Sequence, residues 1–63
     1  MKRYMIIVYN DQGIIARSYD VRQDALDRIL DAAEMGLQAQ LYELQLIDEE
    51  HPEAGLKYVF VEG

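Results

Sequence analysis

Four carboxylates within residues 24–34 (DALDRILDAAE) recur at spacings of three or four. They are Asp24, Asp27, Asp31 and Glu34. At about 100° per residue of α-helix, the four fall within an arc of about 80° and about 4.5–6 Å apart along the axis. A rigid row of carboxylates at this spacing can pair with the arginine and lysine side chains that otherwise hold a phosphate backbone. We refer to these four residues as the acid row.

The same stretch carries aliphatic residues on the other side of the expected helix. We predict that they form the stripe that faces the core, and they are Leu26, Ile29, Leu30 and Ala33. Arg28 stands four residues after Asp24 and three before Asp31, so we expect it to neutralise the acid row in part. Acidic side chains are also a common solvent-facing choice on amphipathic helices, and that simpler interpretation of the row stays open.

A second acidic cluster lies between residues 48 and 53 (DEEHPE). Its acids are Asp48, Glu49, Glu50 and Glu53. Carboxylates beside His51 are metal-ligand types, but the run lacks the spaced acids and the glycine of a calcium loop. We predict no metal site there, and we expect the four acids to add to the surface that binds a partner.

Side chains for nucleophilic or acid–base catalysis are sparse. Ser18 is the only serine, His51 is the only histidine, and the chain has neither cysteine nor threonine. A Ser–His pair would require a strand residue to meet a loop histidine. Paired carboxylates serve glycosidases, but 63 residues leave little volume for a sugar-sized pocket. We therefore predict a protein that is not an enzyme and that holds no cofactor.

The formal net charge is −6, and it is unevenly distributed. Residues 1–18 carry three basic residues against one acid, a sum of +2, whereas residues 19–63 carry three against eleven, a sum of −8. Negative charge disfavours direct binding to nucleic acid or to an anionic membrane, and it suits a basic protein partner. The longest apolar run, Met5 to Tyr9, is far shorter than a membrane span. With no secretion signal and no cysteine, we expect a cytoplasmic protein.

Hydrophobic periodicity predicts four strands and one helix. We place strands at residues 3–9, 14–19, 39–47 and 56–61, and a helix that is capped by Asp20 and runs to about Met35. Gly36 then supplies a left-handed residue beyond the helix end. The prediction is a single ββαββ domain over residues 1–63 of the α+β class. Its four-stranded, mainly antiparallel sheet has the order 2-1-3-4, with the helix on one face.

One helix covers one face of such a sheet, yet the first and last strands are apolar on both faces. At this size folding hides only about 60% of the surface, so a second partly bare face is a large loss. We predict a homodimer joined through the sheet face or along an edge strand. The expected interface residues are Tyr4, Ile6, Val8, Tyr58 and Phe60. The alternative is a monomer whose tyrosines tolerate partial exposure.

The small size, the acidity, the order of elements and the LYEL stretch at residues 41–44 together resemble small acidic proteins that phages make early in infection. Several of those proteins imitate DNA or inhibit host proteins. The resemblance implies an inhibitor, located in the host cytoplasm, that covers a basic nucleic-acid-binding surface with the acid row and the second acidic cluster. Arg28 and Lys57 depart from a purely acidic mimic.

Two functions remain open from the sequence. In the first, the acidic residues engage a basic surface of a nucleic-acid-binding protein, as a DNA mimic would. In the second, the chain is a small dimeric interaction module that acts through its apolar sheet face, without mimicry. Both are binding functions, and they differ in which surface meets the partner.

Overall fold

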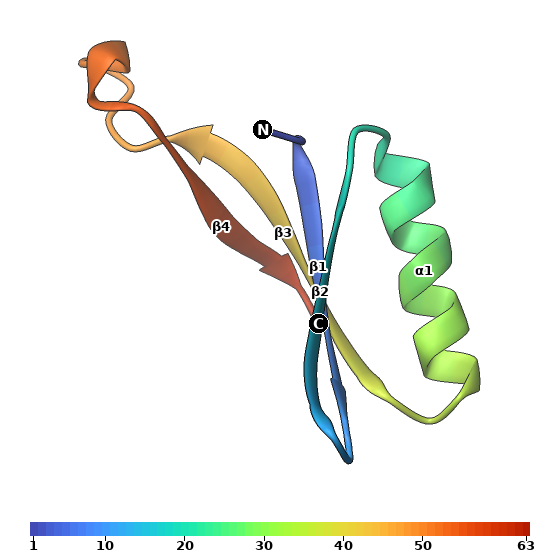
Figure 1. Cartoon of the computed structure of the whole chain (residues 1–63). Coiled ribbons are helices and arrows are strands. Elements are labelled where there is room, and N and C mark those ends of the chain that lie inside the picture. The colour runs from blue at the N-terminus through green and yellow to red at the C-terminus, as the bar shows by residue number, and fades with distance from the viewer.

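Antiparallel pairing joins four strands into one twisted sheet in the computed structural model, which describes all 63 residues (Figure 1). The strands are β1 (Tyr4–Asn10), β2 (Gly13–Tyr19), β3 (Gln38–Leu46) and β4 (Leu56–Glu62). Their spatial order is β2-β1-β3-β4, and each neighbouring pair is antiparallel. The predicted ββαββ fold and the strand order are confirmed. The two central strands, β1 and β3, form the platform on which the helix lies.

A tight turn joins β1 to β2. Asn10 pairs with Gly13, and the backbone N–H of Gln12 donates to Asn10 Oδ1 at 2.8 Å. Only Gly13 has a positive φ, 132°, in this turn. Glycine adopts such a conformation without the steric penalty of a side chain. The turn therefore depends on Gly13, whereas Asn10 contributes through its side-chain oxygen.

The helix α1 (Arg22–Glu34) begins without a side-chain cap. Val21 is the N-cap residue, and its carbonyl accepts from the N–H groups of Asp24 and Ala25 at 3.1 and 3.4 Å. The prediction that Asp20 caps the helix is wrong. The helix starts one residue later than that prediction requires, so the N-cap position holds a valine, which has no side-chain acceptor.

The end of α1 follows the predicted glycine pattern. Gly36 has φ 74°, and its N–H donates to the carbonyl of Ala33 at 3.0 Å. The N–H of Leu37 donates to the carbonyl of Ala32 at 2.9 Å. This pair of hydrogen bonds is the Schellman arrangement, which satisfies carbonyls that the last helical turn leaves free. It also reverses the chain into β3.

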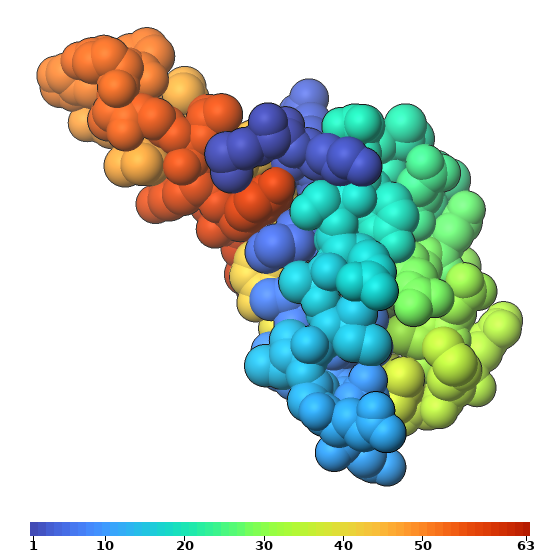
Figure 2. All heavy atoms as spheres, viewed as in Figure 1, coloured from blue at the N-terminus to red at the C-terminus, as the bar shows by residue number.

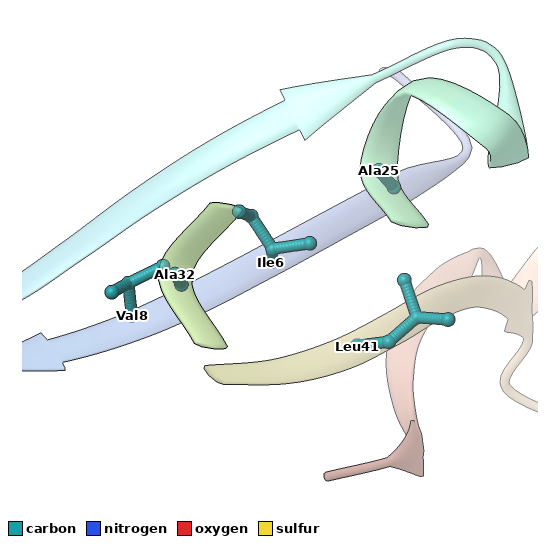
Figure 3. Close-up of a cluster of buried hydrophobic side chains, with 5 residues drawn as sticks. All are labelled: Ile6, Val8, Ala25, Ala32 and Leu41. Atoms are coloured by element: carbon teal, nitrogen blue, oxygen red, sulfur yellow. The ribbon is translucent and has the colours of Figure 1, made fainter. Parts of the chain in front are cut away.

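The buried core lies between α1 and the two central strands (Figure 3). It consists of Ile6, Val8 and Leu41 from the sheet and Ala25 and Ala32 from the helix. Ile6 and Leu41 are opposite one another in the β1–β3 register, and both are fully buried. The two alanines have the smallest apolar side chains available, so the helix can lie close to the sheet. The large side chains of the core come from the strands.

The buried side of the helix differs from the predicted stripe. Leu26 and Ile29 pack against the core, but Leu30 is 60% exposed and Ala33 is exposed. The buried stripe centres on the two alanines, a rotation of about 100° from the predicted direction at about 100° per residue. Hydropathy favours leucine over alanine in such a prediction, whereas close packing against a sheet favours the smaller residue.

The two sheet faces are assigned by the strand register. Residues that alternate with Ile6 and Leu41 point away from the helix, and we call this side the open face. Its large apolar residues are Met5, Ile7, Tyr9, Ile14, Tyr42, Leu44, Leu46, Leu56, Tyr58 and Phe60.

Three of the five predicted interface residues are wrong because they lie on the helix side of the sheet. Ile6 and Val8 are in the core, and Tyr4 packs against it. The other two, Tyr58 and Phe60, lie on the open face. The prediction combined β4 residues of the open face with β1 residues of the helix side, since alternation alone does not say which side of an apolar strand the helix covers.

The far halves of β3 and β4 extend beyond the helix and end in a short 3-10 turn, Pro52–Ala54 (Figure 1). We call this extension the arm, and it protrudes from the rest of the molecule (Figure 2). The radius of gyration is 13.0 Å, whereas a compact chain of this length has about 10.6 Å. The accessible surface is 4526 Å², against about 4,200 Å² for a typical monomer of this mass. The molecule is therefore elongated, with much of its sheet uncovered.

Replacing Gly36 by alanine should lower the free energy of unfolding by about 1 kcal/mol, because alanine is strained at positive φ. No atom lies within 4 Å of the added methyl group, so the strain is conformational rather than a clash. Urea unfolding at a fixed protein concentration measures the change. The matched control is Asp20→Ala, which should cost less than about 0.5 kcal/mol, since no cap hydrogen bond is lost. A larger cost for Asp20→Ala would restore that residue as the cap.

A second pair of substitutions tests the direction in which the helix faces. Leu41→Ala should destabilise the fold by about 2–5 kcal/mol, because it removes a fully buried side chain. Leu30→Ala should change stability by less than about 0.5 kcal/mol, because Leu30 is largely exposed. Thermal and urea unfolding give both values. Equal losses would mean that Leu30 is part of the core after all.

Candidate protein-binding surfaces

All four carboxylates of the acid row are exposed on the side of α1 that faces away from the sheet. Asp27 Oδ1 accepts from the Gln23 side-chain amide at 2.9 Å, one turn earlier. This contact leaves the negative charge of Asp27 intact, since the amide is neutral. The row is thus a set of four solvated charges on one rigid element.

Arg28 does not pair with the acid row. It is half-buried, and neither Asp24 nor Asp31 lies within 4 Å of its guanidinium. The ion pair of the chain is elsewhere, between Arg3 and Glu43 at 3.2 Å, and His51 Nδ1 contacts Asp48 Oδ2 at 2.9 Å. The expected partial neutralisation therefore acts only at longer range, where solvent and salt weaken it.

The second acidic cluster lies at the tip of the arm, away from the helix (Figure 1). There Asp48 organises the turn, because its Oδ1 accepts from the N–H of Glu50 at 3.0 Å and its Oδ2 contacts the His51 ring at 2.9 Å. Glu49, Glu50 and Glu53 are exposed. The structure separates these acids from the acid row, so the two clusters do not form one continuous surface.

The open face is an ordered apolar surface. The rings of Tyr42 and Phe60 meet edge to face, with centroids 5.8 Å apart. Gln40 Oε1 accepts from the hydroxyls of both Tyr9, at 3.1 Å, and Tyr42, at 2.9 Å. The Tyr58 hydroxyl donates to the backbone carbonyl of Lys2 at 2.6 Å. These bonds satisfy the phenol groups, and the rings of Tyr9 and Phe60 remain 37% and 52% exposed for contact with another surface.

Most of this surface was not predicted, because only Tyr58 and Phe60 of its ten large apolar residues were among the expected interface residues. The residues of β1 and β3 that were left out include Met5, Ile7 and Tyr42. The signal was present in the spacing of β3, because Tyr42, Leu44 and Leu46 alternate and would place Leu41 on the opposite face. Leu41 then identifies Ile6, its cross-strand neighbour, as a core residue.

Pockets and ligand clusters are not found in the structure. No concave pocket is detected, and no three histidine or acidic side chains converge as metal ligands. None of the helical residues forms a segment with the length and apolar character needed to cross a bilayer. The two features with a defined chemistry are therefore the acid row and the open face.

The chain matches no known family model, and neither a curated protein nor a solved structure shows significant similarity to it. The resemblance to small acidic phage proteins stays a prediction.

Proposed function

We propose that the protein acts by binding, and that the acid row of α1 engages a basic surface on a nucleic-acid-binding protein. The supporting observation is that four carboxylates stand on the outer side of one helix, exposed and without an ion-pair partner. Unpaired charges of one sign on a rigid element attract a surface of opposite sign and guide its approach.

The spacing of the acid row favours an arginine-rich or lysine-rich partner over a single cation. Successive acids are about 4.5–6 Å apart along the helix axis, which is of the same order as the axial separation of about 3.4 Å between adjacent phosphates of one DNA strand. Basic side chains that are arranged to hold phosphates can therefore reach consecutive carboxylates. The helix holds the row in place before binding, so little order has to be gained in the complex.

The aspartates of the acid row lower the stability of the helix, which supports a role for them in binding. Aspartate is a weaker helix former than glutamate, yet Asp24, Asp27 and Asp31 all lie within α1. Asp24 lies in the first turn, where the helix dipole offsets this penalty, but Asp27 and Asp31 are further along. Solubility alone would be served as well by glutamate.

A second function is favoured by the open face, which could bind an apolar partner without any mimicry of nucleic acid. Six large apolar residues on this face and at the arm are at least 37% exposed: Tyr9, Ile14, Leu46, Ile47, Leu56 and Phe60. Exposed apolar surface of this extent usually marks an interface. The two functions differ in their response to salt, because only the electrostatic one is screened.

The protein is immobilised and exposed to a lysate of the cells that produce it, and the proteins that bind are identified. The dissociation constant of each partner is then measured with purified proteins. If the acid row is the contact, binding should weaken steadily as salt rises, and duplex DNA should compete for the partner. The double variant Asp27→Asn/Asp31→Asn should bind about 2- to 30-fold more weakly, at about 0.2–1 kcal/mol for each charge pair.

The matched control is Glu49→Gln/Glu50→Gln, which removes the same two charges at the arm tip. It should retain at least half of the affinity, because those residues lie away from the acid row. Equal losses in the two double variants would show that net charge rather than the position of the charges matters. Binding that is unchanged by high salt would contradict the electrostatic proposal and favour the open face.

A further inference from the structure

The open face carries no formal charge on its strand residues, although the chain has a net charge of −6. Between its large apolar residues stand only Ala16, Ser18 and glutamines of β3. We propose that a second copy of this chain covers the open face, so that the two sheets pack against each other about a two-fold axis. This inference is independent of the acid row, which lies on the other side of the sheet.

Charge selects a second copy over a basic partner for this face. Two chains of net charge −6 repel wherever their acids approach, and both acidic clusters lie off the open face. Face-to-face packing therefore keeps the acid rows of two like-charged molecules on the outer sides of the dimer. A basic protein would gain no charge pair on this face and would leave its own cations desolvated.

The area is sufficient for a stable dimer. Tyr9, Ile14, Leu46, Leu56 and Phe60 are between 37% and 65% exposed, and the other five large apolar residues of the face are partly exposed. At about 200 Å² for a fully exposed side chain of this size, the face offers on the order of 600 Å² of apolar surface per copy. Two copies would bury roughly 1,200 Å², the lower end of the range for specific interfaces.

The elongated shape suggests how the copies fit together. The apolar residues run along the open face from Ile14, near the β1–β2 turn, to Leu46 and Leu56 on the arm. Tyr42 and Phe60 lie between these ends. A two-fold axis near that aromatic pair brings the arm of one copy over the β1–β2 hairpin of the other. Each arm then gains a covering surface that its own helix, at the other end of the sheet, does not supply.

Because the core of one chain is small, burial of the open face in a dimer would add to the stability of the fold. Only Ile6 and Leu41 are large side chains that are completely buried in one chain. Small domains without disulfides or metals commonly need a partner chain to reach useful stability. In the dimer the sheet has apolar layers on both faces, with α1 on one side and the second sheet on the other.

Sedimentation equilibrium over a concentration series tests the proposal. The wild-type chain should sediment at twice its mass of 7.3 kDa at micromolar concentrations, and its melting temperature should rise with concentration. Phe60→Glu places a charge at the centre of the interface, and Ile14→Glu places one at its end. Each should raise the dimer dissociation constant by at least 100-fold and yield a monomer at the same concentration.

Leu30→Glu is the matched control, because Leu30 is 60% exposed but lies on the helix. It adds the same charge and should leave the dimer intact. If Phe60→Glu fails to fold, the proposal is judged on Ile14→Glu, whose side chain is 65% exposed in a single chain. A wild-type monomer at 100 µM would overturn the proposal, as would a dimer that survives both glutamate substitutions on the open face, since that dimer would be joined along a strand edge.

Discussion

A single helix of 13 residues can cover only one side of a four-stranded sheet, and the rest of the structure depends on this limit. The helix lies on β1 and β3 and buries Ile6, Val8 and Leu41 beneath two alanines. The opposite side of the same strands is also apolar, and no helix or strand packs over it. Burial is therefore incomplete in one molecule, and the free side is a surface with large hydrophobic groups.

The twist of the sheet also makes the molecule elongated. Because strands twist, the far halves of β3 and β4 turn away from the helix and become an arm that only its own hairpin supports. The arm carries apolar residues on its open side and acids at its tip. A compact chain of 63 residues would fold this hairpin back on the core, but the twist and the short helix leave it extended.

Charge and apolar surface are kept on separate sides of the molecule. The acid row faces solvent from the outer side of α1, and the strand residues of the open face are uncharged. This separation gives the chain two surfaces of different chemistry that can be occupied at the same time. One is suited to a basic partner, and the other to a surface as apolar as itself. We propose that a second copy of the chain occupies the open face, so that a dimer displays two acid rows.

The element order, the sheet order and the helix end followed from local patterns. Strand alternation, the turn at Gly13 and the glycine after the helix depend on a few neighbouring residues, so their physics is visible in the sequence. The acid row was equally predictable, because residues three and four apart share one side of a helix wherever that helix lies. The start of the helix was not, since the N-cap position falls on Val21, which has no side-chain acceptor, rather than on Asp20.

What only the tertiary structure decided is which side of each element faces inward. Strand β1 is apolar on both sides, so its sequence does not distinguish the helix side, with Ile6 and Val8, from the open side, with Met5 and Ile7. The choice arises because the crossover through α1 can pack on one side only, and because alanine rather than leucine fits the narrow gap above β1 and β3. The same packing left Leu30 in solvent and placed the acids of residues 48–53 at the end of an arm, apart from the acid row.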